Sequence, residues 1–117
     1  MAFTRIYTGA DGKSHMEVLD LTSAPDWTKM QDATGVQFRV DQPGRFSDWH
    51  QAPRRQFVIT LEGEGEIGLG DGTVHRFGPG NINLVEDVTG EGHTTRVVSD
   101  IPRVTVTIPL ADQTPGG

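Results

Sequence analysis

The sequence predicts an all-β domain, a small barrel or sandwich, and three observations lead to that prediction. Glycine is abundant, with 15 among 117 residues, and there is no long run of the helix-favouring residues Ala, Leu, Lys and Glu. Val, Ile and Thr recur in short bursts, as expected for strands. Turn residues separate these bursts about every 8–12 residues, a spacing typical of sandwiches and barrels. A chain of this length supports one core, so we expect one domain over residues 1–110.

The N-terminal part of the chain predicts a hairpin followed by one helical turn. Residues 3–7 and 15–21 are apolar-rich runs on either side of a glycine-containing turn, and we expect them to pair as strands. Residues 23–31 form the only segment with helical features, because Ser23 can cap a helix and Pro25 suits an early helical position.

Alternation of apolar and polar residues predicts the remaining strands. Val36, Phe38 and Val40 alternate with polar neighbours, as on a half-buried strand. The longest alternating run covers residues 56–62. Further strands are expected at 67–69, 97–98 and 104–108, with a two-residue hairpin turn at Asp71-Gly72 and a corner at 78–80. Residues 111–117 are expected to form a disordered tail.

Composition and charge limit the classes of partner and location. The net charge of −6 argues against nucleic acid, and Arg54-Arg55 is the only basic cluster. No stretch approaches the roughly 20 apolar residues of a membrane helix, and the first residues show no secretory signal. Cysteine is absent, so disulfides and thiolate chemistry are excluded. We therefore expect a cytoplasmic protein with neither nucleic-acid nor membrane partners.

Residues 44–72 and 75–96 read as two related halves of one pocket. Each half begins near a glycine-containing turn, continues through an alternating strand and carries one well-placed histidine, His50 in the first and His93 in the second. This arrangement resembles the cupin superfamily, and the resemblance covers roughly residues 36–108. The WHxAPxRQ-like and EDxTGxGH-like segments are similar to those of small single-domain bacterial cupins. The resemblance implies a cupin-like β-barrel (double-stranded β-helix, or jelly roll) with at most a short helical turn.

The resemblance also implies a metal site, which this chain keeps only in part. A cupin's first motif usually carries a His-x-His pair and a Glu, and these positions fall on His50, Ala52 and Gln56. The histidine of the second motif falls on His93. The implied ligands to a divalent ion (Fe, Mn, Ni or Zn) are therefore His50, His93 and Gln56. Asp48 shares a strand face with His50 and would complete a two-His-one-carboxylate set suited to ferrous iron.

Without a metal, the same residues suit acid/base chemistry. An imidazole titrates near neutral pH, so His50 or His93 can move a proton to or from a bound small molecule. Gln56 can orient the substrate, because its amide both donates and accepts hydrogen bonds. The alternative for either histidine is a structural hydrogen bond to a neighbouring strand. His15 and His75 have no comparable context, and we expect them to be surface or structural residues.

Several further residues are candidates for contact with the substrate. Arg54 or Arg55 can bind a substrate carboxylate through its guanidinium. The alternative for these two arginines is that they lie in a solvated loop or form an ion pair at a dimer edge. Glu86-Asp87 can orient the ring of His93 or form an acidic, solvated turn. Trp49 is expected to face away from His50 and to pack in the core or an interface. The predicted substrate-binding residues are Arg54, Arg55, Val58, Thr60 and Glu86.

Three functions from different classes remain open at this point. The first, which we favour, is an enzyme of the isomerase, cyclase or lyase type that uses His50, His93 and Gln56 on a small organic substrate. The second is a metal-dependent oxygenase or isomerase with a reduced ligand set. The third is a non-catalytic small-molecule-binding module. In each case we expect a homodimer, in which the N-terminal hairpin extends the partner's sheet.

Overall fold

The computed structural model describes residues 3–115, which form two β-sheets and a single turn of helix. The all-β expectation, with one short helical turn, is confirmed. The strands are β1 (Phe3–Thr8), β2 (Ser14–Leu19), β3 (Gln37–Asp41), β4 (Phe46–His50), β5 (Gln56–Glu62), β6 (Gly65–Gly68), β7 (Val74–Phe77), β8 (Ile82–Val85), β9 (His93–Val97) and β10 (Arg103–Pro109), and the 3-10 helix is η1 (Pro25–Thr28).

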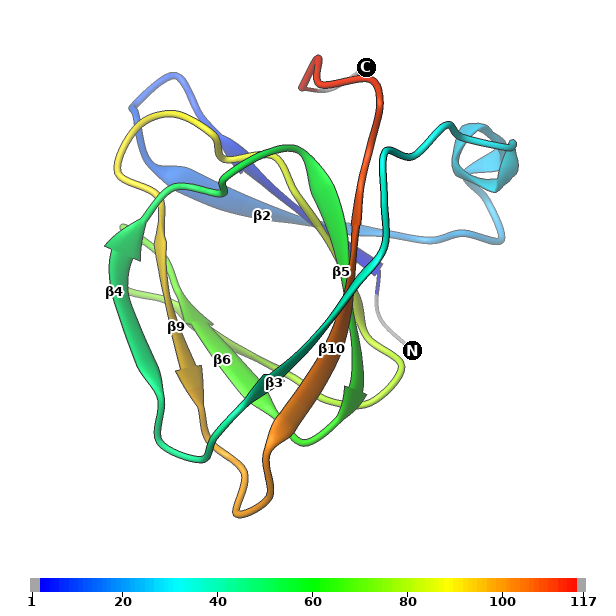
Figure 1. The fold of residues 1–117 in the computed structure, drawn as a ribbon. Helices are drawn as coiled ribbons and strands as arrows, with labels where there is room; N and C mark the ends of the chain where they lie inside the picture. Colours follow the sequence, from blue (N-terminus) through cyan, green and yellow to red (C-terminus); the bar gives the residue numbers. More distant parts are fainter. Residues whose placement is uncertain (1–2, 116–117) are drawn as a thin grey trace.

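The two sheets face each other and enclose the interior of a jelly-roll barrel (Figure 1). The larger sheet has the strand order β2-β1-β8-β5-β10-β3, and the smaller has the order β4-β9-β6-β7. All pairings are antiparallel except that of β1 with β8. The predicted N-terminal hairpin forms, but β1 lies inside its own sheet between β2 and β8, so the hairpin extends the sheet of its own subunit.

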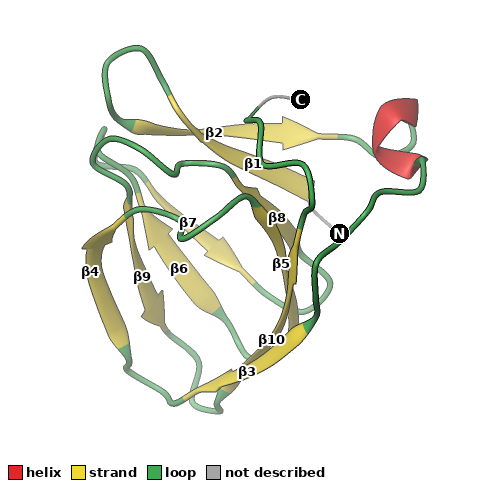
Figure 2. Cartoon of the chain, turned by 45° about the horizontal axis from the view of Figure 1, so that its top comes forward, coloured by secondary structure: helices red, strands yellow, loops and turns green. Residues whose placement is uncertain are grey.

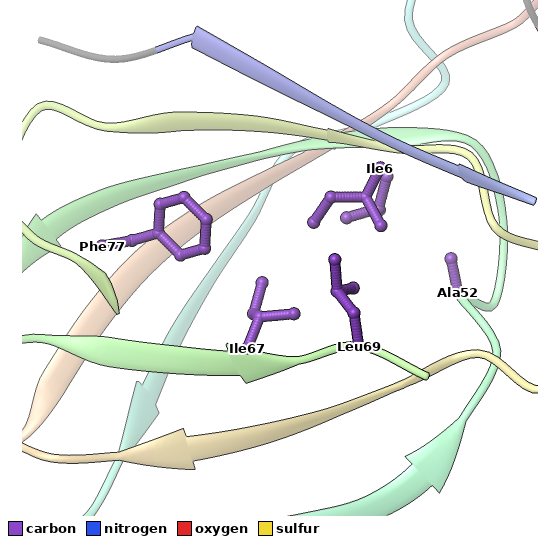
Figure 3. Close-up of a cluster of buried hydrophobic side chains, with 6 residues drawn as sticks. Ile6, Ala52, Ile67, Leu69 and Phe77 are labelled. Atoms are coloured by element: carbon purple, nitrogen blue, oxygen red, sulfur yellow. The ribbon is translucent and has the colours of Figure 1, made fainter. Parts of the chain in front are cut away.

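Apolar side chains fill one part of the barrel and cover part of its outside. Ile6 of the large sheet meets Ile67 and Phe77 of the small one inside the barrel (Figure 3), and Val85 belongs to the same cluster. On the outer face of the large sheet, Trp27 of η1 packs against Phe3 and Phe57, with ring centroids 5.7 and 6.2 Å away. The helix therefore lies outside the two sheets, where Figure 2 shows it in red.

Strand β3 departs from the usual rule that apolar residues point inward. The strand expected at residues 36–40 forms, but Phe38 and Val40 are 69% and 60% exposed, so the expected half-burial is wrong. Two facts explain the inversion. Strand β3 is the edge of the large sheet, and Trp27 of η1 packs over Phe3 and Phe57 and not over β3. Its inward-facing residues Arg39 and Asp41 line a polar cavity.

The C-terminal segment is attached to the barrel over residues 111–114, where a disordered tail was expected. The Gln113 side chain accepts a hydrogen bond from the backbone N–H of Arg55 at 2.7 Å and donates to the Arg55 carbonyl at 2.9 Å. Residues 116–117 of the expected tail lie outside the described residues. No helix in residues 3–115 is long and apolar enough to cross a membrane.

Candidate functional site

A cavity of about 500 Å³ lies between the two sheets and is lined by strands of both. The alternation of side chains along β10 makes this part of the cavity wall polar. Arg103, Thr105 and Thr107 point inward, and the valines of β10 point outward. The cavity is therefore polar over much of its wall. Its polar lining includes Asp48, His50, Gln56, Asn83, His93, Arg103 and Thr105.

His93 is held by a buried carboxylate. Its Nδ1 lies 2.5 Å from Oδ2 of Asp87, and the Ser14 hydroxyl donates to the same oxygen at 2.6 Å. The side chain of Asp87 is fully buried and that of His93 is 6% exposed. An ionised carboxylate only accepts hydrogen bonds, so the contact places the ring proton on Nδ1. The neutral ring of His93 therefore keeps Nε2 free of a proton.

His50 lies beside His93 with the same ring nitrogen engaged. Its Nδ1 donates to the backbone carbonyl of Asp48 at 2.7 Å, which again leaves Nε2 unprotonated in the neutral ring. The two ring centroids are 4.5 Å apart. His50 pairs with His93 across β4 and β9, after a register shift that follows Ser47. Such irregularities re-aim side chains near functional sites.

The orienting role considered for Glu86-Asp87 falls to one member of that pair. Asp87 contacts His93, whereas Glu86 turns away from the cavity. Glu86 accepts from Nε of Arg5 at 2.7 Å and from Nε of Arg55 at 3.0 Å. The loop is therefore not an acidic, solvated turn at these two positions, because both carboxylates are buried.

Four of the predicted substrate-binding residues lie away from the cavity wall. Arg55 is buried in its ion pair with Glu86, and Arg54 is exposed. Thr60 is covered by Arg103, whose Nη2 donates to the threonine hydroxyl at 3.1 Å. The expectation that these side chains contact the substrate in the cavity is therefore corrected. The fifth, Val58, lines the cavity as expected.

Three aromatic or imidazole side chains lie outside the site. Trp49 is 51% exposed and does not line the cavity, so it faces away from His50 as expected but does not pack in the core. His15 bonds to Asp11 through Nε2, at 2.9 and 3.0 Å from the two carboxylate oxygens. His75 bonds to the hydroxyl of Thr73 at 3.1 Å. Neither histidine lines the cavity.

The residues that the cupin pattern aligns with metal ligands do not form a complete metal site. Among residues 3–115, no group of three or more His, Cys, Asp and Glu side chains is placed to hold a metal ion. The expected set of Asp48, His50 and His93 is therefore not assembled. The Asp48 carboxylate instead accepts from the backbone N–H of Trp49 at 2.9 Å. Two imidazoles and the neutral amide of Gln56 remain, a weak donor set for a divalent ion.

Arg103 is one of the lining residues that the sequence analysis missed. It is 6% exposed, and its Nε has no hydrogen-bond partner among the described residues. Burial lowers the pKa of Arg103 below its ordinary value, and the nearby charge of Asp41 opposes that shift. The available signal was the alternation of Arg103, Thr105 and Thr107 with Val104 and Val106, which places three polar residues on one face of a strand.

Solved structures share this arrangement of sheets. The polyketide cyclase RemF from Streptomyces resistomycificus superposes with a TM-score of 0.56 and 18% identity, over 93% of this chain and 72% of that one. A sugar phosphate isomerase of the cupin superfamily from Silicibacter pomeroyi gives a TM-score of 0.54 and 20% identity, over 87% of this chain and 61% of that one. A Cupin 2 conserved barrel domain protein from Salinispora arenicola gives 0.50 and 19%, over 65% and 62%.

These likenesses show the fold. The chain is a cupin-like β-barrel, so the expected fold class is confirmed. The matches cover less than two thirds of the isomerase and of the Cupin 2 protein. No family model matches the chain, and no curated protein matches it.

Proposed function

We propose that this protein is a small-molecule enzyme in which His50 and His93 transfer protons to and from a substrate bound in the barrel cavity. The observation that carries the proposal is the buried Asp87–His93 pair with the ring of His50 4.5 Å from that of His93. A carboxylate that orients an imidazole beside a cavity is an arrangement that general-base catalysis uses. The reaction class is isomerisation, cyclisation or elimination.

The ring tautomers support a mechanism in which one histidine acts as a general base and the other as a general acid. Each neutral ring has an unprotonated Nε2, because its Nδ1 is engaged by a hydrogen-bond acceptor. One ring takes a proton from a substrate carbon or hydroxyl, and the other, in its protonated form, delivers a proton to a second atom. The exchange balances, since one proton leaves the substrate and one is returned to it. Isomerisations and eliminations require this pair of steps.

Asp87 and Gln56 have positioning roles in the proposed mechanism. The buried carboxylate of Asp87 fixes the orientation and the tautomer of the His93 ring. Gln56 is 8% exposed and lines the same cavity, so its amide can hold a substrate carbonyl or hydroxyl in a fixed orientation. Val58 provides an apolar part of the wall against which a carbon skeleton can pack.

Two of the proteins with this fold carry names that fit the proposed reaction class, a polyketide cyclase and a sugar phosphate isomerase. The fold accommodates such reactions, and the argument for this chain rests on its own histidines. A metal-dependent reaction is the less favoured alternative, because Asp48 lines the cavity but does not assemble with His50 and His93 into a metal-binding group among residues 3–115. No step of the proposed mechanism passes through a metal.

A hydrogen–deuterium exchange experiment tests the proposal and does not require the product to be identified. The purified protein is incubated in D₂O with sugar phosphates and 2-oxo acids, and loss of the C–H proton signals relative to a protein-free sample is followed by NMR. A residue that abstracts a proton replaces it by deuterium even when no net reaction occurs. We expect exchange on at least one compound, slowed about 100-fold or more in His93→Asn and in His50→Asn.

His15→Asn is the matched control, because His15 lies outside the cavity and should leave exchange unchanged. Exchange that disappears after treatment with a chelator and returns with a divalent metal would favour the metal-dependent alternative. Binding of a compound without exchange, with equal affinity in the wild type and the His50/His93 double variant, would instead identify a binding module.

A further inference from the structure

We propose that the cavity contains an anion-binding subsite in which the buried guanidinium of Arg103 binds a carboxylate or phosphate group of the substrate. The inference rests on the proposed function for the use of the cavity, and it adds the chemical class of the molecule bound there. Its evidence comes from a different part of the cavity wall than the histidine pair.

Arg103 is a buried charge without a carboxylate partner. Among the described residues, no carboxylate lies within ion-pair distance of its guanidinium, and its one hydrogen bond runs from Nη2 to the hydroxyl of Thr60 at 3.1 Å. Buried ions are costly unless they are paired, and an arginine side chain stays protonated in proteins. A buried guanidinium without a carboxylate partner favours binding of an anion, because a bound carboxylate or phosphate would supply that partner.

The opposite sheet is shaped to receive this side chain. A Cβ at Gly65 would lie 2.6 Å from Nε and 2.8 Å from Cζ of Arg103. The guanidinium thus crosses the barrel from β10 and rests against the backbone of β6, where an added Cβ would force it to shift. The position of the positive charge is therefore fixed by both sheets before any ligand binds.

Two further arginines strengthen the positive charge toward solvent. Arg39 and Arg45 also line the cavity and are half exposed, and both pair with Asp41, at 3.3 and 2.5 Å. One carboxylate therefore faces three guanidinium groups in this part of the wall. In a chain of net charge −6, such a local excess of positive charge draws anionic molecules to the cavity.

The spacing along the small sheet separates the subsite from the histidines. Gly65, against which the guanidinium rests, pairs with Val97 on β9, and His93 is four residues from Val97 on the same strand. Four residues of strand correspond to about 13 Å. A substrate held by its anionic group at Arg103 would extend along the cavity and present its other end to His50 and His93.

Calorimetric titration with inorganic phosphate and with succinate tests the subsite directly. Both probes are titrated into wild-type protein, Arg103→Met and the control Arg54→Gln at constant ionic strength. We expect at least one probe to bind to the wild type and the control, and its Kd to rise about tenfold or more in Arg103→Met. The tighter of the two probes identifies the anion as a phosphate or a carboxylate. Equal binding by Arg103→Met, or no binding of either probe to the wild type, would overturn the proposal.

Two further variants keep the test independent of folding and of the proposed function. Gly65→Ala retains the charge of Arg103 but displaces the guanidinium, and we expect weaker probe binding in it as well. His93→Asn should bind both probes as the wild type does. If His93→Asn binds normally and no compound exchanges its protons, the subsite stands and the proposed function fails. If exchange depends on His93 while no probe binding depends on Arg103, the subsite fails alone.

Discussion

Nearly all of the buried polar side chains in residues 3–115 have partners, and the exceptions lie at the candidate site. Oδ1 of Asp87 and Nε of Arg103 are the two buried side-chain atoms without a hydrogen-bond partner in this part of the chain. An unpartnered buried polar atom costs about 1–3 kcal/mol, so a fold retains few of them. One belongs to the residue that holds His93, and the other to the proposed anion-binding residue. Of the two residues, Arg103 lines the cavity, where a polar ligand would supply the missing partner.

Glu86 is a buried carboxylate whose role we infer to be stabilisation of the fold through its ion pairs. Glu86→Gln should lower the free energy of unfolding by about 3–5 kcal/mol, because it removes the charge of a buried carboxylate that pairs with the buried guanidinium of Arg55. Glu17→Gln is the control, since Glu17 also pairs with Arg5 but is half exposed, and about 0–1 kcal/mol is expected. Urea denaturation measures both. Equal losses in the two variants would contradict the structural role of Glu86.

A turn carboxylate gives a prediction about pH. The hydroxyl and the backbone N–H of Thr73 donate to Asp71, and these bonds lower the pKa of Asp71 below its ordinary value of 3.8. Because the folded-state pKa is lowered, the resulting stability is present above pH 3.8 and is lost as the pH falls through the lowered value. Thr73→Val should therefore raise the pKa of Asp71 toward 3.8.

Carbon-13 NMR of the carboxyl groups measures this shift residue by residue. Asp20 is the internal control, because the hydroxyl and backbone N–H of Thr22 lower its pKa in the same way and the substitution leaves them in place. A pKa of Asp71 that does not change in Thr73→Val would show that the threonine hydroxyl has no part in the shift.

At the scale of single residues, the sequence located the histidines better than the substrate-binding side chains. His50 and His93 are adjacent because motif positions on two strands determine which face they occupy. Arg55 and Glu86 were misplaced, because a charged residue next to a motif looks the same in sequence whether it faces a ligand or a buried counter-charge. Only the tertiary fold brings Arg55 and Glu86, 31 residues apart, into one ion pair.

At the level of secondary-structure elements, the approach of the β9 end to β4 fixes the geometry of the two histidines. Gly92 has a φ of +75°, and a Cβ there would overlap the backbone carbonyl of His50 and lie 2.7 Å from the backbone nitrogen of Gln51. Both conditions require glycine at position 92. The strand that carries His93 can therefore approach His50 only because this residue has no side chain.

Gly92→Ala should consequently cost at least about 3 kcal/mol of unfolding free energy, the sum of backbone strain and a clash with main-chain atoms. Gly72→Ala is the matched control: its φ is +88°, but an added Cβ would meet nothing within 4 Å, so only strain of about 1–2 kcal/mol is expected. Chemical denaturation of both variants measures the difference. Equal losses would show that the close approach to His50 contributes nothing to stability.

Local pattern predicted some strands well and others poorly. The hairpin of β1 and β2, the long strands β5 and β10 and the single helical turn follow from turn residues and alternation. Strands β7 and β8 are four residues each, which is too short for alternation to stand out. The burial of β3 was misjudged, because alternation identifies two faces without saying which one points into the barrel.

For the molecule as a whole, the outward-facing apolar residues of β3 and β5 leave an apolar surface on the outside of the barrel. Val36, Phe38, Val40 and Leu61 are 64%, 69%, 60% and 44% exposed, and β3 is also an unpaired edge of its sheet. The segment around η1 covers only the part of this outer face near β1, β8 and β5. Contiguous exposed apolar residues beside a sheet edge are typical of a protein–protein interface.

We therefore expect this surface, rather than the N-terminal hairpin, to form the predicted homodimer. Phe38→Glu should convert the protein to a monomer, because it would place charges in the apolar centre of the contact, where they would lose water without gaining a counter-charge. Met30→Glu is the control, since Met30 is 97% exposed and lies outside the surface formed by β3, β10 and β5. Sedimentation velocity over a range of concentrations measures the state of each variant. A wild type that stays monomeric throughout would contradict the predicted homodimer. A Phe38→Glu variant that dimerises like the wild type would show that the contact lies elsewhere, and the β2 edge would become the next candidate.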